Sequence, residues 1–178
     1  MYGTDKLMAS DEALMLDFQR GSREAFEELF SRYREPLYGF FRRRLALTSR
    51  AEDLTHETFL AVIQATTRYE PRATVRSYLY GIAFNLLSAE RRKLGRDLES
   101  EVSREPASRE VAPDICLWVQ QALDKLEDTE REILMLREYE QLSYDEIARL
   151  LRVPVNTVRS RLYRSRMAMK NLLQPSEA

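Results

Sequence analysis

The chain has 178 residues and a formal net charge of −1 at pH 7, with 44% hydrophobic and 32% charged residues. This length accommodates one domain or two small ones, each with an apolar core. The single cysteine, Cys116, excludes an intramolecular disulfide framework, and no apolar run approaches a membrane span. The N-terminal stretch MYGTDKLMASDEALM lacks the apolar core of a signal peptide. Five glycines and six prolines fit an all-helical protein with few turns.

The first part of the chain predicts amphipathic helices. Ser10 or Asp11 can cap a short helix, and Ser22 can begin the next one. In that second helix, apolar residues recur at helical spacing: Phe26, Leu29, Phe30, Tyr33 and Leu37. Pro36 predicts a kink or the start of a new helix. Three arginines at 42–44 form a basic cluster that we expect on the surface, as a solubilising charge or as a contact to nucleic acid.

Ser49 and Glu52 fit a capping box, so the clearest helix of the chain is predicted to begin there. One of its faces is apolar or small: Ala51, Leu54, Thr55, Thr58, Phe59, Val62, Ile63 and Thr66. The other face is mostly acidic with one leucine: Glu52, Asp53, His56, Glu57, Leu60 and Gln64. Such a face is usually a solvated surface. His56 is the only histidine, so a metalloprotease motif, which needs a second one, is excluded.

Residues 68–96 carry seven basic and two acidic residues. Pro71 predicts a loop, after which a helix is expected from about residue 75 to residue 93. Its buried stripe is predicted to contain Val75, Tyr78, Leu79, Ile82, Ala83, Leu86 and Leu87. Basic residues at 91–93 would lie in the last turn, where they suit the helix dipole. Basic and aromatic residues together also suit single-stranded nucleic acid.

Beyond this helix the apolar periodicity stops. Residues 96–114 contain six acids, three arginines and two prolines. This composition predicts a flexible linker over residues 96–113, between a domain of residues 10–95 and one of residues 114–174. Relaxed, the linker would span roughly 25 Å, and fully stretched roughly 60 Å.

The second domain begins with a predicted amphipathic helix at 115–126. We expect Cys116 and Trp118 of this helix to lie in the core. Thr129 with Glu132 fits a cap for the next helix, which carries Ile133, Leu134 and Leu136.

The stretch LSYDEIARLLRVPVNTVRSRLYRSR, residues 142–166, predicts a helix-turn-helix. Ser143 with Glu146 fits a capping box, and Pro154 separates the two helices. The second helix can be buried against the first through Val158 and Leu162, which leaves other side chains pointing outward: Arg159, Ser160, Tyr163 and Arg164. From residue 147 to 176 there are seven basic residues and no acids. This pattern suits the DNA major groove, and the alternative is a helical hairpin with a solvated basic face.

The residues of three segments resemble the bacterial sigma-70 family of RNA polymerase sigma factors, most of all its extracytoplasmic-function (ECF) group. LSYDEIARLL followed by VPVNTVRSRLYRSR resembles the region that reads the −35 promoter element, except that Arg152 stands where the family usually has glycine. The resemblance implies duplex contacts from Asn156, Thr157, Arg159, Ser160, Arg161, Tyr163, Arg164 and Arg166.

AEDLTHETFLAV resembles the segment that docks on the clamp helices of the polymerase β′ subunit. The polymerase contacts implied are Glu52, Asp53, Glu57 and Leu60. VRSYLYGIAFNLLSAERRK resembles the segment that captures the −10 element as single-stranded DNA. Asn85 matches a base-reading asparagine, and the implied contacts are Arg72, Arg76, Tyr78, Asn85 and Arg92. Tyr78 stands where tryptophan is common, and Ala89 where an aspartate is common.

The resemblance covers about residues 11–173 and implies an all-α sigma factor with two small helical domains, no catalytic residues, no metal and no cofactor. Implied partners are core RNA polymerase, through its β′ clamp helices and β subunit, and promoter DNA that is duplex at −35 and single-stranded at −10. Members of the group are often held inactive by an anti-sigma factor, which is a further implied partner. We expect no membrane insertion and a cytoplasmic location. The alternative is a helix-turn-helix regulator that acts without polymerase. An enzyme would need a nucleophile paired with a base, a metal cluster or a phosphate loop, and the sequence contains none of these patterns.

Overall fold

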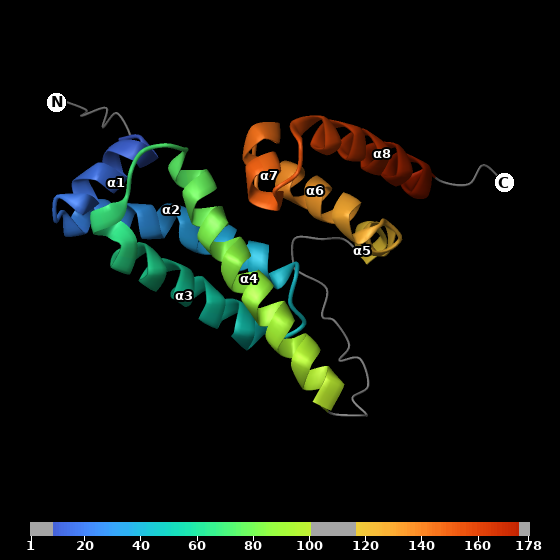
Figure 1. The fold of residues 1–178 in the computed structure, drawn as a ribbon, viewed down its shortest axis with the longest axis horizontal. Helices are drawn as coiled ribbons and strands as arrows, with labels where there is room; N and C mark the ends of the chain where they lie inside the picture. The colour runs from blue at the N-terminus through green and yellow to red at the C-terminus, as the bar shows by residue number, and fades with distance from the viewer. Residues whose placement is uncertain (1–8, 101–116, 175–178) are drawn as a thin grey trace, which may run out of the picture.

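The computed structural model describes residues 9–100 and 117–174, and every regular element within them is a helix (Figure 1). This confirms the predicted all-α class. The first unit contains α1 (Asp11–Gln19), α2 (Arg23–Arg42), α3 (Thr48–Ala65), the short 3-10 helix η1 (Thr66–Arg68) and α4 (Val75–Ser100). The second contains α5 (Leu117–Asp124), α6 (Asp128–Glu138), α7 (Tyr144–Leu151) and α8 (Val155–Leu173).

The first two helices begin where their polar caps predict. Ser10 and Ser22 each accept a hydrogen bond from the backbone N–H three residues further on. The second helix continues through Pro36 and does not restart there. Proline removes one backbone hydrogen bond, but the turns on either side bury Tyr33, Leu37 and Phe40 almost completely, which stabilises a continuous helix.

The predicted capping box of α3 is wrong. The helix begins at Thr48 behind Leu47, which makes no side-chain cap, so Ser49 lies inside the first turn. The predicted buried face is confirmed for Ala51, Leu54, Thr55, Thr58, Phe59, Val62 and Thr66. Ile63 is the exception, because its side chain is 45% exposed.

The fourth helix is longer than the sequence predicts. It continues to Ser100, so residues 91–93 are not its last turn and residues 96–100 of the predicted linker are helical. The rest of that linker, 101–113, lies outside the described residues. The predicted stripe is largely confirmed, with Val75, Leu79, Ala83 and Leu87 buried. Tyr80, which the stripe did not include, is also buried against Phe40.

Two predictions about the second unit are wrong. Trp118 is 58% exposed and does not belong to the core, while Cys116 lies outside the described residues. The sixth helix begins at Asp128 behind Glu127, which makes no side-chain cap, so Thr129 is already helical. The buried positions Ile133, Leu134 and Leu136 are confirmed.

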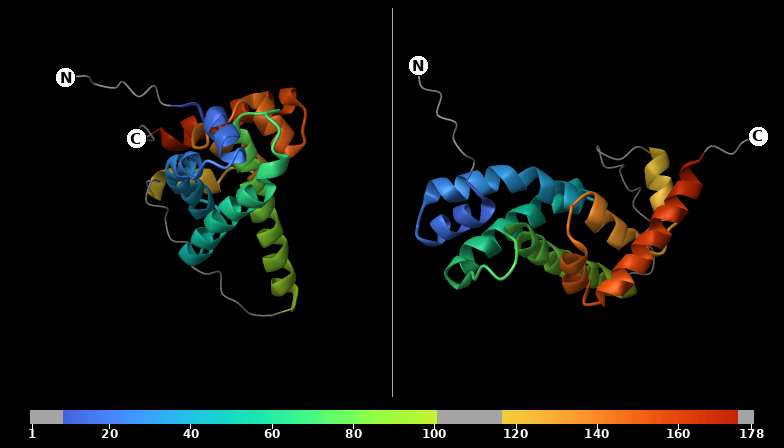
Figure 2. Two further views of the ribbon diagram at one scale, coloured as in Figure 1. Left: turned by 90° about the vertical axis from the view of Figure 1, so that its left-hand side faces the viewer. Right: turned by 90° about the horizontal axis from the view of Figure 1, so that it is seen from above.

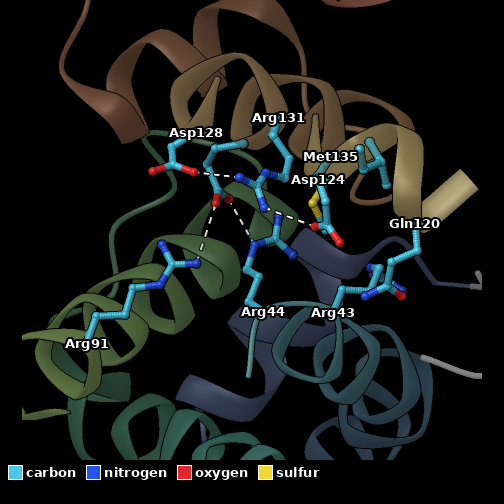
Figure 3. A pocket seen from close by; sticks show the side chains of 10 residues that line it. Arg43, Arg44, Arg91, Gln120, Asp124, Asp128, Arg131 and Met135 are labelled. Carbon is cyan, nitrogen blue, oxygen red and sulfur yellow. Dashed lines mark hydrogen bonds and ion pairs between the residues drawn. The ribbon is translucent and has the colours of Figure 1, made fainter. Parts of the chain in front are cut away.

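The two units adjoin each other, with α7 beside the beginning of α4 (Figures 1 and 2). The basic cluster at 42–44 lies at this junction. All three arginines are buried, with exposures of 5%, 9% and 6%, so the predicted surface position is wrong. The carboxylates that pair with Arg43 and Arg44 come from the second unit, which local sequence could not reveal (Figure 3). Among the helices described, none is both long and apolar enough to cross a membrane.

Candidate nucleic-acid and polymerase interfaces

The turn between α7 and α8 has the geometry of a helix-turn-helix. The predicted capping box is confirmed: Ser143 N–H donates to Glu146 Oε2 at 2.8 Å, and Glu146 N–H donates to Ser143 Oγ at 3.3 Å. The seventh helix ends at Leu151 and is capped by Arg152, whose φ of 56° and ψ of 46° are left-handed. The following Val153 N–H donates to the Ala148 carbonyl at 3.0 Å, which closes the turn.

One face of α8 packs against the other helices of the second unit, and the opposite face is exposed to solvent. Val158 and Leu162 are 0% and 1% exposed, as predicted. Ser165 is also buried and donates to the Glu130 carbonyl at 3.1 Å, which ties α8 to α6. Of the candidate −35 contacts, Asn156, Arg159, Ser160, Tyr163, Arg164 and Arg166 are exposed, while Thr157 and Arg161 are partly buried. An exposed basic face opposite a buried seam can enter a major groove.

Two candidate DNA contacts on α8 have exposed guanidinium groups that form ion pairs, Arg164 with a partly buried glutamate and Arg166 with an exposed one. Arg164 Nε lies 3.2 Å from Glu130, and Arg166 Nη2 lies 2.7 Å from Glu138. The hydrogen bond with Glu138 raises the pKa of the Arg166 guanidinium. Exposed ion pairs contribute only about 0–1 kcal/mol, so either arginine can exchange its carboxylate for a phosphate or a base edge.

The candidate −10 residues lie along α4 and the loop before it. Tyr78, Asn85 and Arg92 are seven residues apart, about two helical turns, so they follow one side of the helix. Asn85 and Arg92 are exposed, while Tyr78 is partly buried and packs edge-on against Tyr69 at 5.2 Å. Burial raises the pKa of the Tyr78 hydroxyl. Asn85 therefore offers its amide to solvent, about two helical turns beyond Tyr78.

The two remaining −10 candidates have different surroundings. Arg72 is exposed and forms an ion pair with Glu70, two residues earlier in the loop. Arg76 is partly buried, and its Nη1 donates to the backbone carbonyl of Glu140 in the second unit at 3.4 Å. The structure thus places Arg72 on the open loop and turns Arg76 toward the segment between α6 and α7.

The polar face of α3 carries the candidate polymerase contacts. Glu52, Asp53 and Leu60 are exposed, Leu60 by 55%, and Glu57 is partly buried. The opposite face of α3 is buried in the core, so the polar face is the one available to a partner.

An arginine that sequence reasoning missed organises this face. Arg50 Nη1 lies 3.4 Å from Asp53 and 3.1 Å from Glu57. Its Nε and Nη2 donate to Glu90 of α4 at 2.8 and 2.9 Å. Asp53 and Glu57 follow Arg50 by three and seven residues, a helical spacing from which the sequence could have predicted these two contacts. The contact with Glu90 of α4 could not be predicted in this way, because it forms only in the folded chain. No group of His, Cys, Asp and Glu suited to a metal ion occurs among the residues described.

Comparisons with known proteins match both units. The family model described as Sigma-70 region 2 matches residues 29–97, and that of Sigma-70, region 4 matches residues 116–169. The chain is 30% identical to the RNA polymerase sigma-H factor of Pseudomonas aeruginosa, over 93% of this chain and 94% of that protein. It is 27% identical to the ECF RNA polymerase sigma-E factor of Haemophilus influenzae, over 93% and 96%.

Solved structures show the same fold. CnrH in complex with the cytosolic domain of CnrY gives a TM-score of 0.68 at 24% identity, covering 93% of this chain and 97% of that one. The sigma factor RpoE from Bartonella quintana, in complex with the anti-sigma factor NepR, gives 0.69 at 22% identity, covering 85% and 98%. The chain belongs to the sigma-70 family of RNA polymerase sigma factors, in its ECF group, whose members direct RNA polymerase to promoters.

Proposed function

We propose that the chain binds core RNA polymerase, reads the −35 element as duplex DNA with α8, and captures the −10 element as a single strand with α4 and the loop before it. The observation that carries this proposal is the division of α8 into a seam of buried residues, Val158 and Leu162, and an exposed basic face. Both faces lie in a closed helix-turn-helix, which presents its second helix to a groove. Its work is binding, without a bond-making step.

The −10 proposal draws support from Asn85. Its amide offers both a donor and an acceptor, so it can distinguish the edges of unpaired bases. Two exposed arginines supply positive charge for DNA phosphates: Arg72 in the loop before α4, and Arg92 on the same helix as Asn85. Capture of an unstacked base requires a pocket that stacks it and bonds its edge, and a loop beside a helix can build one.

Polymerase docking draws support from α3. An exposed leucine within an acidic face, Leu60 beside Glu52, Asp53 and Glu57, offers an apolar anchor with a charged rim. We assign the β′ clamp helices to this face and the β subunit to the second unit. The domains proposed remain residues 10–95 and 114–174. An anti-sigma factor is a further proposed partner, by analogy with the complex of RpoE with NepR, and the site of action is the cytoplasm.

Run-off transcription with core polymerase and a random promoter library tests the function. A sigma factor yields specific transcripts that share two separated elements, and core polymerase alone yields none. The tagged chain should also co-purify with polymerase subunits. A chain that binds duplex DNA specifically but supports no transcription and recovers no polymerase would instead be a helix-turn-helix regulator.

A further inference from the structure

Two side chains of α1 bind the backbone at the two ends of the loop before α4. At the start of the loop, Gln19 Nε2 donates to the Tyr69 carbonyl at 3.1 Å. At its end, the Val75 N–H donates to Glu12 Oε1 at 3.2 Å. Helix α1 lies beside this loop, although the paired residues are 50 and 63 positions apart in the sequence (Figure 1). We call Glu12 and Gln19 the loop brace.

The braced loop is buried at its ends and exposed in its middle. Tyr69 and Val75 are 5% and 0% exposed, whereas Glu70, Pro71 and Arg72 are exposed. Gln19 holds the Tyr69 carbonyl, and this fixes the plane of the peptide that leads into Glu70, because a peptide unit is rigid. The direction in which the exposed residues leave the core is therefore set at the brace.

Glu12 acts on the first turn of α4. Val75 is the first residue of that helix, and its N–H belongs to the four that find no acceptor inside an α-helix. The carboxylate of Glu12 supplies the acceptor and places a negative charge at the positive end of the helix dipole. Glu12 thereby fixes the residue at which the loop ends and α4, the helix that carries Asn85, begins.

The helix that carries the brace is itself fixed to the core. Leu14 and Met15 are 8% and 0% exposed. At the beginning of α1, Asp11 lies 2.8 Å from Arg32 of α2 and accepts a hydrogen bond from the Tyr33 hydroxyl. Because α1 is anchored without the brace, removal of either brace side chain releases the loop and leaves α1 in place.

We propose that Glu12 and Gln19 are positioning residues for recognition of the −10 element, which hold the loop where it can surround an unpaired base together with α4. They do this without contacting DNA. Contacts that read a base have to be held within about 0.5 Å of the productive geometry, and a loop that must be ordered during binding loses affinity. The inference rests on the proposed function of the loop and α4, and it adds the residues that prepare them for the base.

The test compares holoenzymes formed with variants of the full chain. Glu12→Ala and Gln19→Ala each release one end of the loop. Glu12→Gln keeps an oxygen that can accept from the Val75 N–H, so it is the conservative variant. Asp17→Ala is the matched control, because Asp17 lies in the same helix, is exposed and pairs with Arg20 at 3.1 Å.

The probe is a promoter recovered from the random library, with its −10 region mismatched open. Competition among templates that each carry one changed −10 base measures the base preference, and a second set with changes in the −35 element measures the preference there. Amide hydrogen exchange of the free chain measures the protection of the Val75 N–H.

Glu12→Ala and Gln19→Ala should each lower the preference for the favoured −10 base about tenfold, which is within the range that one base contact contributes. The −35 preference should not change. Glu12→Gln and Asp17→Ala should keep both preferences. The Val75 amide should exchange faster in Glu12→Ala and at the original rate in Glu12→Gln.

An unchanged −10 preference in both alanine variants, at normal helicity, would overturn the positioning role. Equal losses at −10 and −35 would also overturn it, because they would show general damage to the fold. Should an alanine variant lose helicity, Glu12→Met and Gln19→Met, which keep the length of the side chain without its polar group, take its place. Failure of the proposed function is distinguishable, because the unmodified holoenzyme would then show no −10 preference, and the positioning role would fail with it.

Discussion

Arg50 and Glu90 join α3 to α4 through two parallel hydrogen bonds of 2.8 and 2.9 Å, although 40 residues separate them in sequence. The pair is largely shielded, with side-chain exposures of 30% for Arg50 and 9% for Glu90. Hydrogen bonding from Arg50 lowers the pKa of the Glu90 carboxyl. Bidentate pairs of this kind are stronger than single contacts and fix the relative position of two helices.

Glu90→Gln should therefore lower the free energy of unfolding by about 1–2 kcal/mol at neutral pH. Because the folded pKa lies below the ordinary value of 4.5, the contribution is fully present above pH 4.5 and is lost as the pH falls through the folded pKa. Denaturant unfolding of both proteins at decreasing pH measures the difference. It should shrink in acid, and a difference that does not depend on pH would contradict the assignment.

Arg152→Gly should stabilise the protein by about 1 kcal/mol. The residue has a φ of 56°, a conformation that costs a side chain bearing a Cβ but not glycine. Thermal unfolding measures the change. Arg149→Gly, inside α7 and also exposed, is the matched control and should destabilise by about 1 kcal/mol. Equal effects of the two changes would mean that backbone strain at Arg152 is negligible.

Leu60→Ala should weaken binding to core polymerase by about tenfold, or about 1.4 kcal/mol, and leave stability unchanged. Leu60 projects from α3 with more than half of its side chain in solvent, so its removal leaves no cavity. Titration of labelled core polymerase measures the affinity. Leu94→Ala, an exposed leucine on α4, is the control and should bind normally. Normal binding by Leu60→Ala would remove this residue from the docking surface.

Arg164→Ala should cost about 1–3 kcal/mol in binding of the −35 duplex and relax the preference at one base pair. Glu130→Gln is a complementary variant, because it breaks the 3.2 Å ion pair of Arg164 but keeps the arginine side chain. That variant should bind at least as tightly as the unmodified chain. Competition among duplexes with single base changes measures the preference. A uniform loss on every duplex would assign Arg164 to a phosphate.

Asn85→Ala should abolish base preference within the −10 element. The test compares holoenzymes on a duplex promoter and on one with the −10 region already mismatched open. If Asn85 reads a captured base, preference is lost on both templates, and pre-opening restores only part of initiation. Asn171→Ala, an exposed asparagine in α8, should change nothing. Preserved preference on the open template would refute base reading by Asn85.

The sequence by itself determined those features whose partners lie three or four residues apart. The capping box of Ser143 with Glu146 and the seam of Val158 with Leu162 both formed as predicted. The same reasoning failed at Ser49 and Thr129, because each helix begins one residue earlier, at Thr48 and Asp128, which leaves the expected cap inside the first turn.

Tertiary structure alone decided the position of the arginines at 42–44. In sequence they are a basic run, which is indistinguishable from a solvated surface. In the folded chain the carboxylates that bind Arg44 come from Glu132 and Glu140, 88 and 96 residues away. Periodicity within one helix carries no information about charges on another helix. The burial of Arg43 and Arg44 against the second unit therefore follows from the way the two units pack.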